Sequence, residues 1–465
     1  MRVGPDAPTT KLKPRKSWRR RLFKWVGIIS LVVCLLLAGT FVFVFRRGLY
    51  NRFVRFPNEA EAWEELAKQR QEVTLDDGWK EYRGACHAHS ELSHDSDASF
   101  PEILAAMKEA DLEFIFMSDH WVDGKADYSL GWKGSHEGVL FIRGYEMSEG
   151  FMPWGLTDDT VFTKDQDPRE IAGEIAEKNG VLFYAHSEEE RMWDLPELTG
   201  MEIYNIHTDS KDEDLKALAP DLILSLRKYH DHAFRLIFDR QTDILEHWDE
   251  LNKERKIVGI AANDAHQNTG FRGYYTEDGK FRLCGRAPDD DIGEYDLNFI
   301  TRSLLWLAVG PLEPGRELFC ITLDPYQISL RYVNTHLLAQ DKTEATLVDA
   351  LREGRVFIAF DMIGDARGFT YLAQAGDTKA VMGESIAFTP GLTLRAESPL
   401  PCRFVLVRDG EHVCEQEGRA FDRVVEQPGN YRIEAELDIL DEWTPWVYTN
   451  PIYTTAAAPE VAAVR

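Results

Sequence analysis

The pattern of apolar and polar positions divides the chain into an N-terminal apolar run, an alternating middle and a β-rich end. In the middle segment, residues 79–365, short apolar runs alternate with amphipathic stretches. This predicts strands of a parallel sheet with helices packed outside it. The six predicted strands are Glu81–His87, Glu113–Ser118, Val139–Glu146, Val181–Ala185, Gly200–Tyr204 and Ile257–Ala262. Six such units favour a closed barrel, although the pattern is also compatible with an open sheet.

Helix signals lie between and after these strands. Ser99 and Asp167 are N-cap residues that each stand before a helical stretch with proline in its first turn. Two later stretches, Leu297–Gly310 and residues 344–355, also have helical periodicity. The first of these is strongly apolar but has Arg302 near its centre and is too short to cross a membrane. We therefore expect it to be buried in the core.

From about Gly368 the pattern changes to short strands with alternating polarity and glycine-containing turns. This predicts an all-β module over residues 366–455, which we expect to be an immunoglobulin-like sandwich. A structural role packed against the preceding domain and an independent role in ligand binding are both compatible with it. The last residues, 456–465, are predicted to be a disordered tail.

The N-terminus differs from the rest of the chain in charge. Residues 1–55 hold 13 Lys and Arg residues and one acid, whereas the remainder holds 40 basic and 78 acidic residues. Residues 25–45 are an uncharged run of 21 residues, long enough at about 1.5 Å per residue to span a bilayer core. A basic segment, residues 1–24, precedes this transmembrane helix, and a polar stalk, residues 46–78, follows it. A cleaved signal peptide is the alternative, but no small-residue cleavage site follows the run.

The charge distribution also bears on location and partners. Positive charge concentrates on the cytoplasmic side of membrane spans, so we expect a single-pass protein with a cytoplasmic N-terminus and a periplasmic or extracellular body. The acidic body argues against nucleic acid as a partner, because phosphate binding needs a basic face. An excess of carboxylates is compatible with bound cations and with a small-molecule or ester substrate.

Each of the six predicted strands is followed by a histidine, aspartate or glutamate. The carboxyl ends of barrel strands share one face, where active sites assemble. Seven of the 13 histidines come just after these strands, namely His87, His89, His94, His120, His186, His207 and His266. One histidine in such a place is usually structural, and a His-x-His pair occurs often by chance. Together with Asp95, Glu146 and Asp264, however, the seven predict a site for several metal ions.

Five stretches that occur in order carry a resemblance to a known family: CHAHSELSHDS, FIFMSDH, RGYEMS, FYAHS and NDAH. They closely resemble the motifs of the PHP (polymerase and histidinol phosphatase) superfamily of metal-dependent phosphoesterases, over roughly residues 80–270. The resemblance implies a distorted (β/α)7 barrel in an α/β fold that holds two or three divalent metal ions. The β-rich end is similar, less specifically, to the C-terminal module of larger, exported members.

The ligands that the resemblance implies fall into three sets. The set for the first metal is His87, His89, Asp264 and a bridging Glu146. The set for the second metal is Glu146 and His186, with His207 as an open candidate. The set for the third metal is Asp95, His120 and His266.

Three further assignments are open or indirect. Asp95 stands eight residues after His87, where the family has a ligand, and His94 competes for the same role. Asp119 is expected to orient neighbouring ligands without binding a metal itself. Arg272 either clamps a substrate phosphate through its planar guanidinium or is an ordinary surface residue.

The donor types and the resemblance together suggest a reaction. Imidazole and carboxylate donors without a thiolate suit zinc, manganese or iron. A water molecule between two such cations is deprotonated near neutral pH and attacks an electrophile. The resemblance favours a phosphoesterase, but the same chemistry cleaves amides, esters or carbamates. A binding or scaffold protein that has lost activity is the remaining hypothesis, and the complete ligand set argues against it.

Overall fold

The structure is a computed structural model that describes residues 18–212, 218, 220–221, 224–286 and 291–455. Most of the basic segment 1–24 and the whole of the predicted tail 456–465 lie outside the described residues. The chain forms two compact units. They are an N-terminal unit, Met1–Pro57 with Asp214–Ala233, and a main unit, Asn58–Glu213 with Phe234–Arg465.

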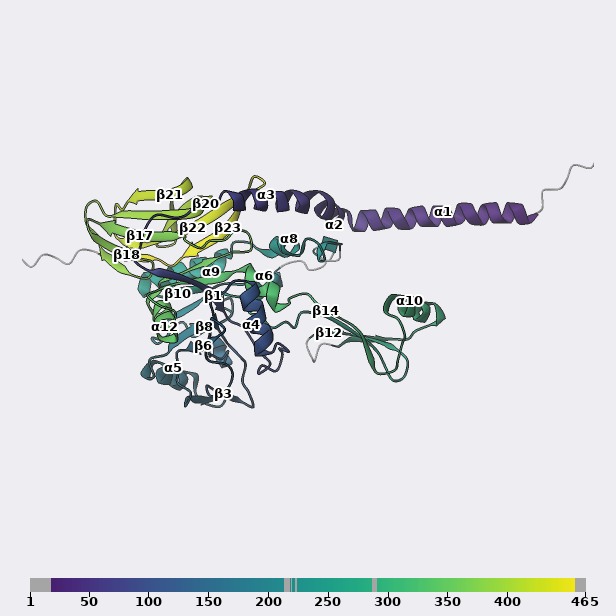
Figure 1. Cartoon of the computed structure of the whole chain (residues 1–465), viewed down its shortest axis with the longest axis horizontal. Helices are drawn as coiled ribbons and strands as arrows, with labels where there is room; N and C mark the ends of the chain where they lie inside the picture. The colour runs from purple at the N-terminus through teal and green to yellow at the C-terminus, as the bar shows by residue number, and fades with distance from the viewer. Residues whose placement is uncertain (1–17, 213–217, 219, 222–223, 287–290, 456–465) are drawn as a thin grey trace, which may run out of the picture. The chain divides into compact units, whose positions relative to one another are not determined.

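The principal element of the N-terminal unit is α1, Trp18–Val44 (Figure 1). Its part Arg21–Val44 is an exposed apolar helix of 24 residues, long and apolar enough to cross a membrane. A signal sequence near the N-terminus passes the same test. Two short helices follow, α2 (Arg46–Tyr50) and a π-helical turn, η1 (Asn51–Arg55).

The six predicted strands of the main unit are present, although some are shorter than expected. In one sheet β1 pairs in parallel with β2, and β2 with β5. In a second sheet β8, β9 and β10 are parallel neighbours. The bounds are Lys80–Cys86 (β1), Phe114–Phe116 (β2), Val139–Ile142 (β5), Val181–Tyr184 (β8), Gly200–Asn205 (β9) and Val258–Ala262 (β10). The main unit is therefore a mixed α/β fold built around parallel strands.

Both faces of the central strands are buried. Ile115 of β2 belongs to one core cluster with helix α4 (Phe100–Glu109), and its neighbour Phe116 belongs to another with α12 (Glu344–Glu353). Successive side chains of a strand point to opposite faces, so the apolar run of β2 fills both cores. The other helices are α3 (Phe56–Lys68), α5 (Pro168–Glu177), α6 (Ile206–Asp212), α8 (His230–Phe234), α9 (Thr242–Glu254) and α11 (Tyr326–Tyr332).

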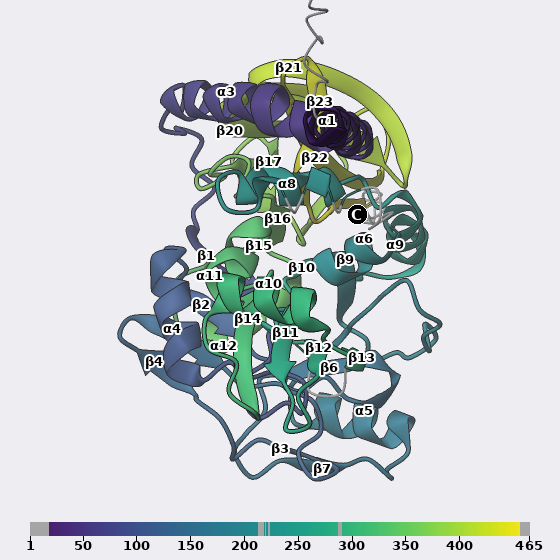
Figure 2. The same cartoon turned by 90° about the vertical axis from the view of Figure 1, so that its right-hand side faces the viewer.

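The predicted β-rich end is present, and its strands continue the first sheet. The additional strands are β15 (Asn334–Ala339), β16 (Val356–Ala359), β17 (Thr370–Ala375), β18 (Thr378–Val381), β19 (Ser385–Ala387), β20 (Thr393–Arg408), β21 (Glu411–Val424), β22 (Gly429–Ile439), β23 (Glu442–Thr449) and β24 (Ile452–Thr455). Because β16 pairs with β23, one succession runs from β22 through β23, β16 and β15 to β1 and β2, and in Figure 2 it descends from β22 and β23 near the top to β1 and β2. Arg432 on β22 also donates to both carboxylate oxygens of Asp249 on α9, at 2.8 and 2.6 Å. This buried ion pair joins the β-rich end to the α/β part.

Four smaller strands complete the α/β part. Their bounds are Lys125–Asp127 (β3), Gly134–His136 (β4), Phe151–Trp154 (β6) and Val161–Thr163 (β7). Strand β3 pairs with β7 in a separate ribbon. Strands β4 and β6 extend the first and second sheets at their edges.

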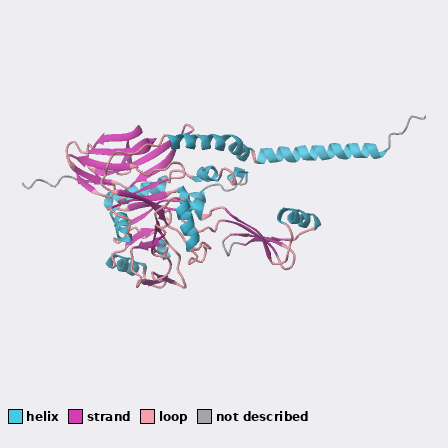
Figure 3. Cartoon of the chain, viewed as in Figure 1, coloured by secondary structure: helices cyan, strands magenta, loops and turns pink. Residues whose placement is uncertain are grey.

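In one part of the main unit, residues 270–322, the sequence pattern predicts the helix but not the strands, and we name this part the arm. It consists of an antiparallel sheet in the order β13-β12-β11-β14 and a helix (Figure 3). The bounds are Gly270–Tyr275 (β11), Phe281–Gly285 (β12), Asp291–Tyr295 (β13), Phe299–Val309 (α10) and Arg316–Thr322 (β14). The expectation that this apolar helix is buried in the core is wrong, because no residue of α10 is buried. The apolar composition of this helix indicates that it prefers apolar surroundings. It does not indicate whether these surroundings are the protein core or something outside this chain.

Candidate metal centre

The chain turns sharply after the parallel strands, which brings the following side chains to one centre. His87, His186 and Asp264 have positive φ angles of 61°, 48° and 44°. This left-handed conformation is unfavourable for residues other than glycine and is concentrated at functional sites. The backbone NH of His89 donates to the carbonyl oxygen of Ala265 at 3.0 Å, which joins the ends of β1 and β10. The strained positions thus follow the buried carboxyl ends of β1, β8 and β10.

Three groups of ligand atoms lie close enough to hold an ion each, with all atoms of a group within 4.8 Å of one another. The first group is His87, His89 and Asp264. The second group is His87, Glu146 and His186. The third group is His89, Asp95, His120 and His266. The three groups resemble the expected sets, but His87 also joins the second group, His89 also joins the third, and Glu146 belongs to the second group and not to the first.

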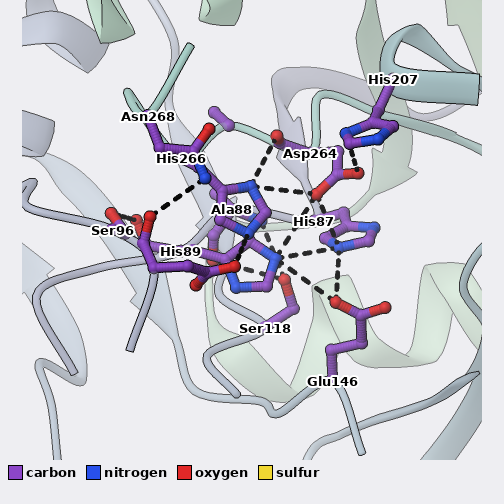
Figure 4. Close-up of polar contacts among 12 residues, drawn as sticks. His87, Ala88, His89, Ser96, Ser118, Glu146, His207, Asp264, His266 and Asn268 are labelled. Atoms are coloured by element: carbon purple, nitrogen blue, oxygen red, sulfur yellow. Dashed lines mark hydrogen bonds and ion pairs between the residues drawn. The ribbon is translucent and has the colours of Figure 1, made fainter. Parts of the chain in front are cut away.

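The ligand atoms are spaced as they would be around shared cations (Figure 4). His87 Nε2 lies 3.2 Å from Glu146 Oε2 and 3.2 Å from Asp264 Oδ1. The same nitrogen lies 3.0 Å from His89 Nε2. Two ligand atoms that each lie about 2.1 Å from a tetrahedral ion are about 3.4 Å apart. These imidazole and carboxylate atoms all offer electron pairs toward the same region.

Asp95 holds the third group together. Its Oδ2 lies 3.4 Å from Nε2 of His120 and 3.4 Å from Nε2 of His266. The rings of His89 and His266 stack, with centroids 3.7 Å apart. His94, which competes with Asp95 in the sequence, has a side chain that is 73% exposed and belongs to none of the three groups. The geometry favours Asp95 as the ligand.

Two carboxylate oxygens in this centre are buried without a hydrogen-bond partner among the described residues, Asp95 Oδ1 and Asp264 Oδ1. A buried charged oxygen without a partner is strongly unfavourable, so such atoms normally bind a donor or a cation. Divalent ions fit the positions that these oxygens leave unsatisfied.

Sequence reasoning misses one residue that supports the centre, Glu202 in the middle of β9. It is 1% exposed, and its Oε1 accepts a hydrogen bond from Nδ1 of His87 at 2.5 Å. Its Oε2 accepts from the backbone NH of His186 at 2.8 Å and from the amide of Asn205 at 2.9 Å. With Nδ1 as the donor, His87 keeps the lone pair of Nε2 for a metal. A glutamate inside a buried strand is the signal that identifies it.

Asp119 supports the loop that carries His89. It is buried, and its carboxylate accepts hydrogen bonds from the backbone NH of Ser90 at 2.6 Å and from the hydroxyl of Ser93 at 2.9 Å. The Ser93 oxygen in turn lies 3.2 Å from Nδ1 of His89. Asp119 belongs to none of the ligand groups, so its effect on His89 passes through Ser93.

His207 and Arg272 are placed differently from the other candidates. His207 is half-exposed and lies beside the centre, with Nδ1 3.6 Å from Asp264 Oδ2, but it belongs to none of the three groups (Figure 4). The guanidinium of Arg272 donates to Asp97 at 2.6 Å. An open cavity of about 340 Å³ lies beside the centre, and its lining is His94, His120, Trp121, Glu146, Met147, Ser148 and Lys164. Arg272 is not part of that lining.

Protonated histidines balance the carboxylates of the centre when no cation is bound. Burial alone would raise the pKa of Glu146 and Asp264, but the charge of His87 and hydrogen bonds from neighbouring rings hold both pKa values well below the usual range. Burial would lower the pKa of His186, but the same two carboxylates raise it to about 9. Burial and the charges of neighbouring rings lower the pKa of His89 to about 3. A divalent cation would displace protons from the ligating rings.

Comparisons with known proteins find similarity only among solved structures. No family model matches the chain, and no curated protein matches it. Among solved structures, the chain is similar to a two-domain protein from Bacteroides vulgatus ATCC 8482 containing a predicted PHP-like metal-dependent phosphoesterase. The sequences are 12% identical and the TM-score is 0.34, over 82% of this chain and 99% of that chain. At this level of likeness, the chemistry of the site has to be argued from its own geometry.

Proposed function

We propose that this chain is a membrane-anchored, metal-dependent phosphoesterase of the PHP type, with a distorted (β/α)7 barrel and two or three divalent ions at the strand ends. The observation that carries the proposal is the arrangement around His87 Nε2. There, a second imidazole nitrogen at 3.0 Å and two carboxylate oxygens at 3.2 Å face one region. In an ion-pair cluster that only stabilised the fold, each acceptor would pair with its own donor.

The donor set supports zinc, manganese or iron as the metal. Imidazole and carboxylate groups suit all three ions. Cys86 precedes His87 but is buried in the hydrophobic core, and burial raises the pKa of its thiol to about 12, so it offers no thiolate. Bound at this centre, divalent cations would supply Lewis acidity to the attacking water and to the phosphate oxygens.

The cavity beside the centre supports an anionic substrate. Lys164 lines it and forms no ion pair with any residue that the structure describes, so its ammonium group is available to a phosphate. His94 lines the same cavity and has an exposed ring for a second contact. Arg272 is a more distant candidate for a phosphate clamp, because it would first have to release Asp97. We keep His207 as an additional ligand that would join the second metal beside Asp264.

The anchor and its orientation are part of the proposal. We infer that α1 spans the membrane with its N-terminus in the cytoplasm and that the main unit is periplasmic or extracellular. The 13 basic residues within the first 55 positions support this orientation. Protection of the main unit from a protease added to spheroplasts, in which the periplasmic face of the inner membrane is accessible, would contradict it.

The decisive experiment measures metal content and turnover on the same sample of the full chain. The wild type is expected to hold two or three equivalents of metal and to cleave aryl phosphate esters. His87→Ala combined with His89→Ala removes ligand atoms from all three groups. Turnover should then fall by about a thousandfold together with the metal content. His412→Gln, at an exposed histidine that pairs with Glu415, is the control and should match the wild type.

Three other outcomes would redirect the proposal. Unchanged turnover in the double variant would exclude this centre as the active site. Turnover of aryl esters, amides or carbamates without turnover of phosphates would assign the same centre to the alternative hydrolase. A wild type without metal and without turnover after addition of Mn²⁺ or Zn²⁺ would favour an inactive binding or scaffold protein.

A further inference from the structure

Helix α10 presents an apolar surface to the outside of the arm. None of its residues is buried. The exposed fraction is 86% for Phe299, 61% for Leu304 and 75% for Leu307. A surface helix of a folded unit normally turns its apolar stripe inward and its polar residues outward. In α10 the outward face is the apolar one, so the described part of the chain leaves that face uncovered.

The inner side of α10 is already occupied by the arm. Arg302, the only charged residue of the helix, places its guanidinium 5.4 Å from the ring centroid of Tyr275 on β11. Leu305 and Val309, which lie one turn apart near Arg302, are only partly exposed. Apart from Thr301, Arg302 and Ser303, the exposed residues of α10 are apolar, and its large exposed side chains are Phe299, Ile300, Leu304, Trp306 and Leu307.

The uncharged polar side chains of α10 are satisfied within the helix and its cap. The hydroxyl of Ser303 donates to the carbonyl of Phe299 at 2.7 Å, and the hydroxyl of Thr301 donates to the carbonyl of Asn298 at 3.2 Å. The side chain of Asn298 caps the first turn by accepting from the backbone NH of Thr301 at 2.9 Å. The helix can therefore enter an apolar medium without leaving these groups unpaired, which is the main requirement for contact with lipid.

The base of the arm is fixed beside the metal centre. The arm begins four residues after His266, and its guanidinium groups Arg272 and Arg286 both approach Asp97, at 2.6 and 3.9 Å. Figure 1 shows α10 at the far end of the arm, away from the sheets of the main unit. The arm thus connects the uncovered helix to the loops that carry the ligands.

We propose that α10 lies in the interface of a lipid bilayer, with its outward face among the acyl chains. The inference rests on the proposed anchoring by α1, because a tethered chain keeps the arm at a high effective concentration near lipid. The 11 residues of α10 cover about 16 Å at 1.5 Å per residue, roughly half of a bilayer core. The helix is therefore suited to lie along the membrane surface and not to span it.

One feature favours lipid over a second copy of this chain. Trp306 is 57% exposed on the outer face, and tryptophan is enriched at membrane interfaces. Residues 270–322 hold six basic and nine acidic side chains. Apolar burial, and not attraction to anionic headgroups, is therefore the driving force.

The test uses the full chain reconstituted into vesicles of phosphatidylcholine or of its dibrominated analogue, whose bromine atoms quench tryptophan near the acyl chains. The signal of Trp306 is the difference between the wild type and Trp306→Phe. Brominated lipid is expected to remove roughly half of this signal, because an interfacial helix buries its apolar face about 5–10 Å deep. Added salt should leave the quenching unchanged.

Two variants separate the outer face of α10 from general effects. Leu304→Glu combined with Leu307→Glu places two charges on this face and should abolish the quenching of Trp306. Val424→Glu, at a position on β21 that is 55% exposed, is the matched control and should leave the quenching as in the wild type. All variants should float with the vesicles, because flotation reports the anchor α1.

Each contrary outcome is distinguishable. Floating wild-type protein whose Trp306 signal is insensitive to bromination would overturn the inference and leave the anchor and the metal centre untouched. A Trp306 signal that depends on protein density in the vesicle, and not on bromination, would assign the face to a second copy and also overturn it. Failure of the wild type to float would overturn both the anchor and this inference, while metal content would still report the hydrolase.

Discussion

The main unit contains two buried clusters of histidine and carboxylate residues, which differ in how their polar atoms face one another. At the junction of β1 and β15, both ring nitrogens of His336 have their own carboxylate. Nδ1 lies 2.6 Å from Glu81 and Nε2 lies 2.9 Å from Asp361. The guanidinium of Arg83 adds a positive charge 3.5 Å from Asp361. Both nitrogens of the His336 ring thus have a carboxylate acceptor, so the ring is satisfied without an ion.

In the metal centre, by contrast, several imidazole nitrogens and carboxylate oxygens converge on one region and do not pair one to one. His87 Nε2 meets His89 Nε2 at 3.0 Å, and Asp264 Oδ1 has no hydrogen-bond partner among the described residues. The residue types are nearly the same as in the His336 cluster. What separates a candidate metal site from a structural ion pair is therefore the direction of the lone pairs, and not the presence of buried histidine.

Glu202→Gln is expected to have the largest effect on this contrast. Glutamine keeps the shape and can still accept a hydrogen bond from Nδ1 of His87, but it removes the charge that makes Nε2 a stronger ligand. Metal affinity, measured by competition with a chromogenic chelator, should fall by about 10–100-fold. Wild-type affinity in this variant would show that Glu202 is only a packing partner. His336→Gln is the control for this measurement and should keep wild-type affinity.

The convergence of the ligands could be predicted from the sequence because parallel strands place their carboxyl ends on one face. The pattern of a polar residue after each strand therefore predicts that these side chains lie close together, and the fold brings His87, His186 and Asp264 together. Glu202 could not be predicted in this way because it lies within a strand and not after it. Within a strand, the pattern of apolar residues indicates only which positions belong to the core. The pairing of His336 cannot be predicted from the sequence either, since only its neighbours in space show that it is buried and paired.

The arm could not be predicted for a different reason. The apolar residues of α10 have the composition of a core helix, and composition does not specify what covers them. The strands β11 and β14 pair over a long loop, which local periodicity cannot detect. The sequence therefore predicts the surroundings of elements that bury their apolar face in their own unit. It does not predict those of α10, which leaves this face exposed.

His336→Gln should reduce stability in a pH-dependent way. Burial alone would lower the pKa of His336, but the charges of Asp361 and Glu81 raise it from 6.5 to about 9. Because the folded pKa exceeds the unfolded one, the protonated ring contributes fully below pH 6.5, and its contribution is lost as the pH rises through 9. The free energy of unfolding should therefore fall by about 2 kcal/mol near pH 6 and by less toward pH 9.5, in denaturant titrations.

Two measurements sharpen this prediction. His412→Gln removes an exposed pair with Glu415 and should change the free energy of unfolding by less than about 0.5 kcal/mol at any of these pH values. The metal content of His336→Gln should stay at the wild-type value. Loss of metal in His336→Gln would mean that the two clusters are coupled and that the contrast between them does not hold.

The smallest effect is expected at Lys164, which lines the cavity but belongs to neither cluster. Lys164→Met removes a positive charge that would stabilise an anionic substrate equally in the ground state and in the transition state. KM for an aryl phosphate should rise by about 3–10-fold while kcat changes little. Lys125→Met, on the neighbouring strand β3 and outside the cavity lining, is the matched control and should behave as the wild type. If Lys164→Met raised KM for a neutral aryl ester to the same extent, the effect would come from the packing of the β3–β7 ribbon and not from recognition of substrate charge.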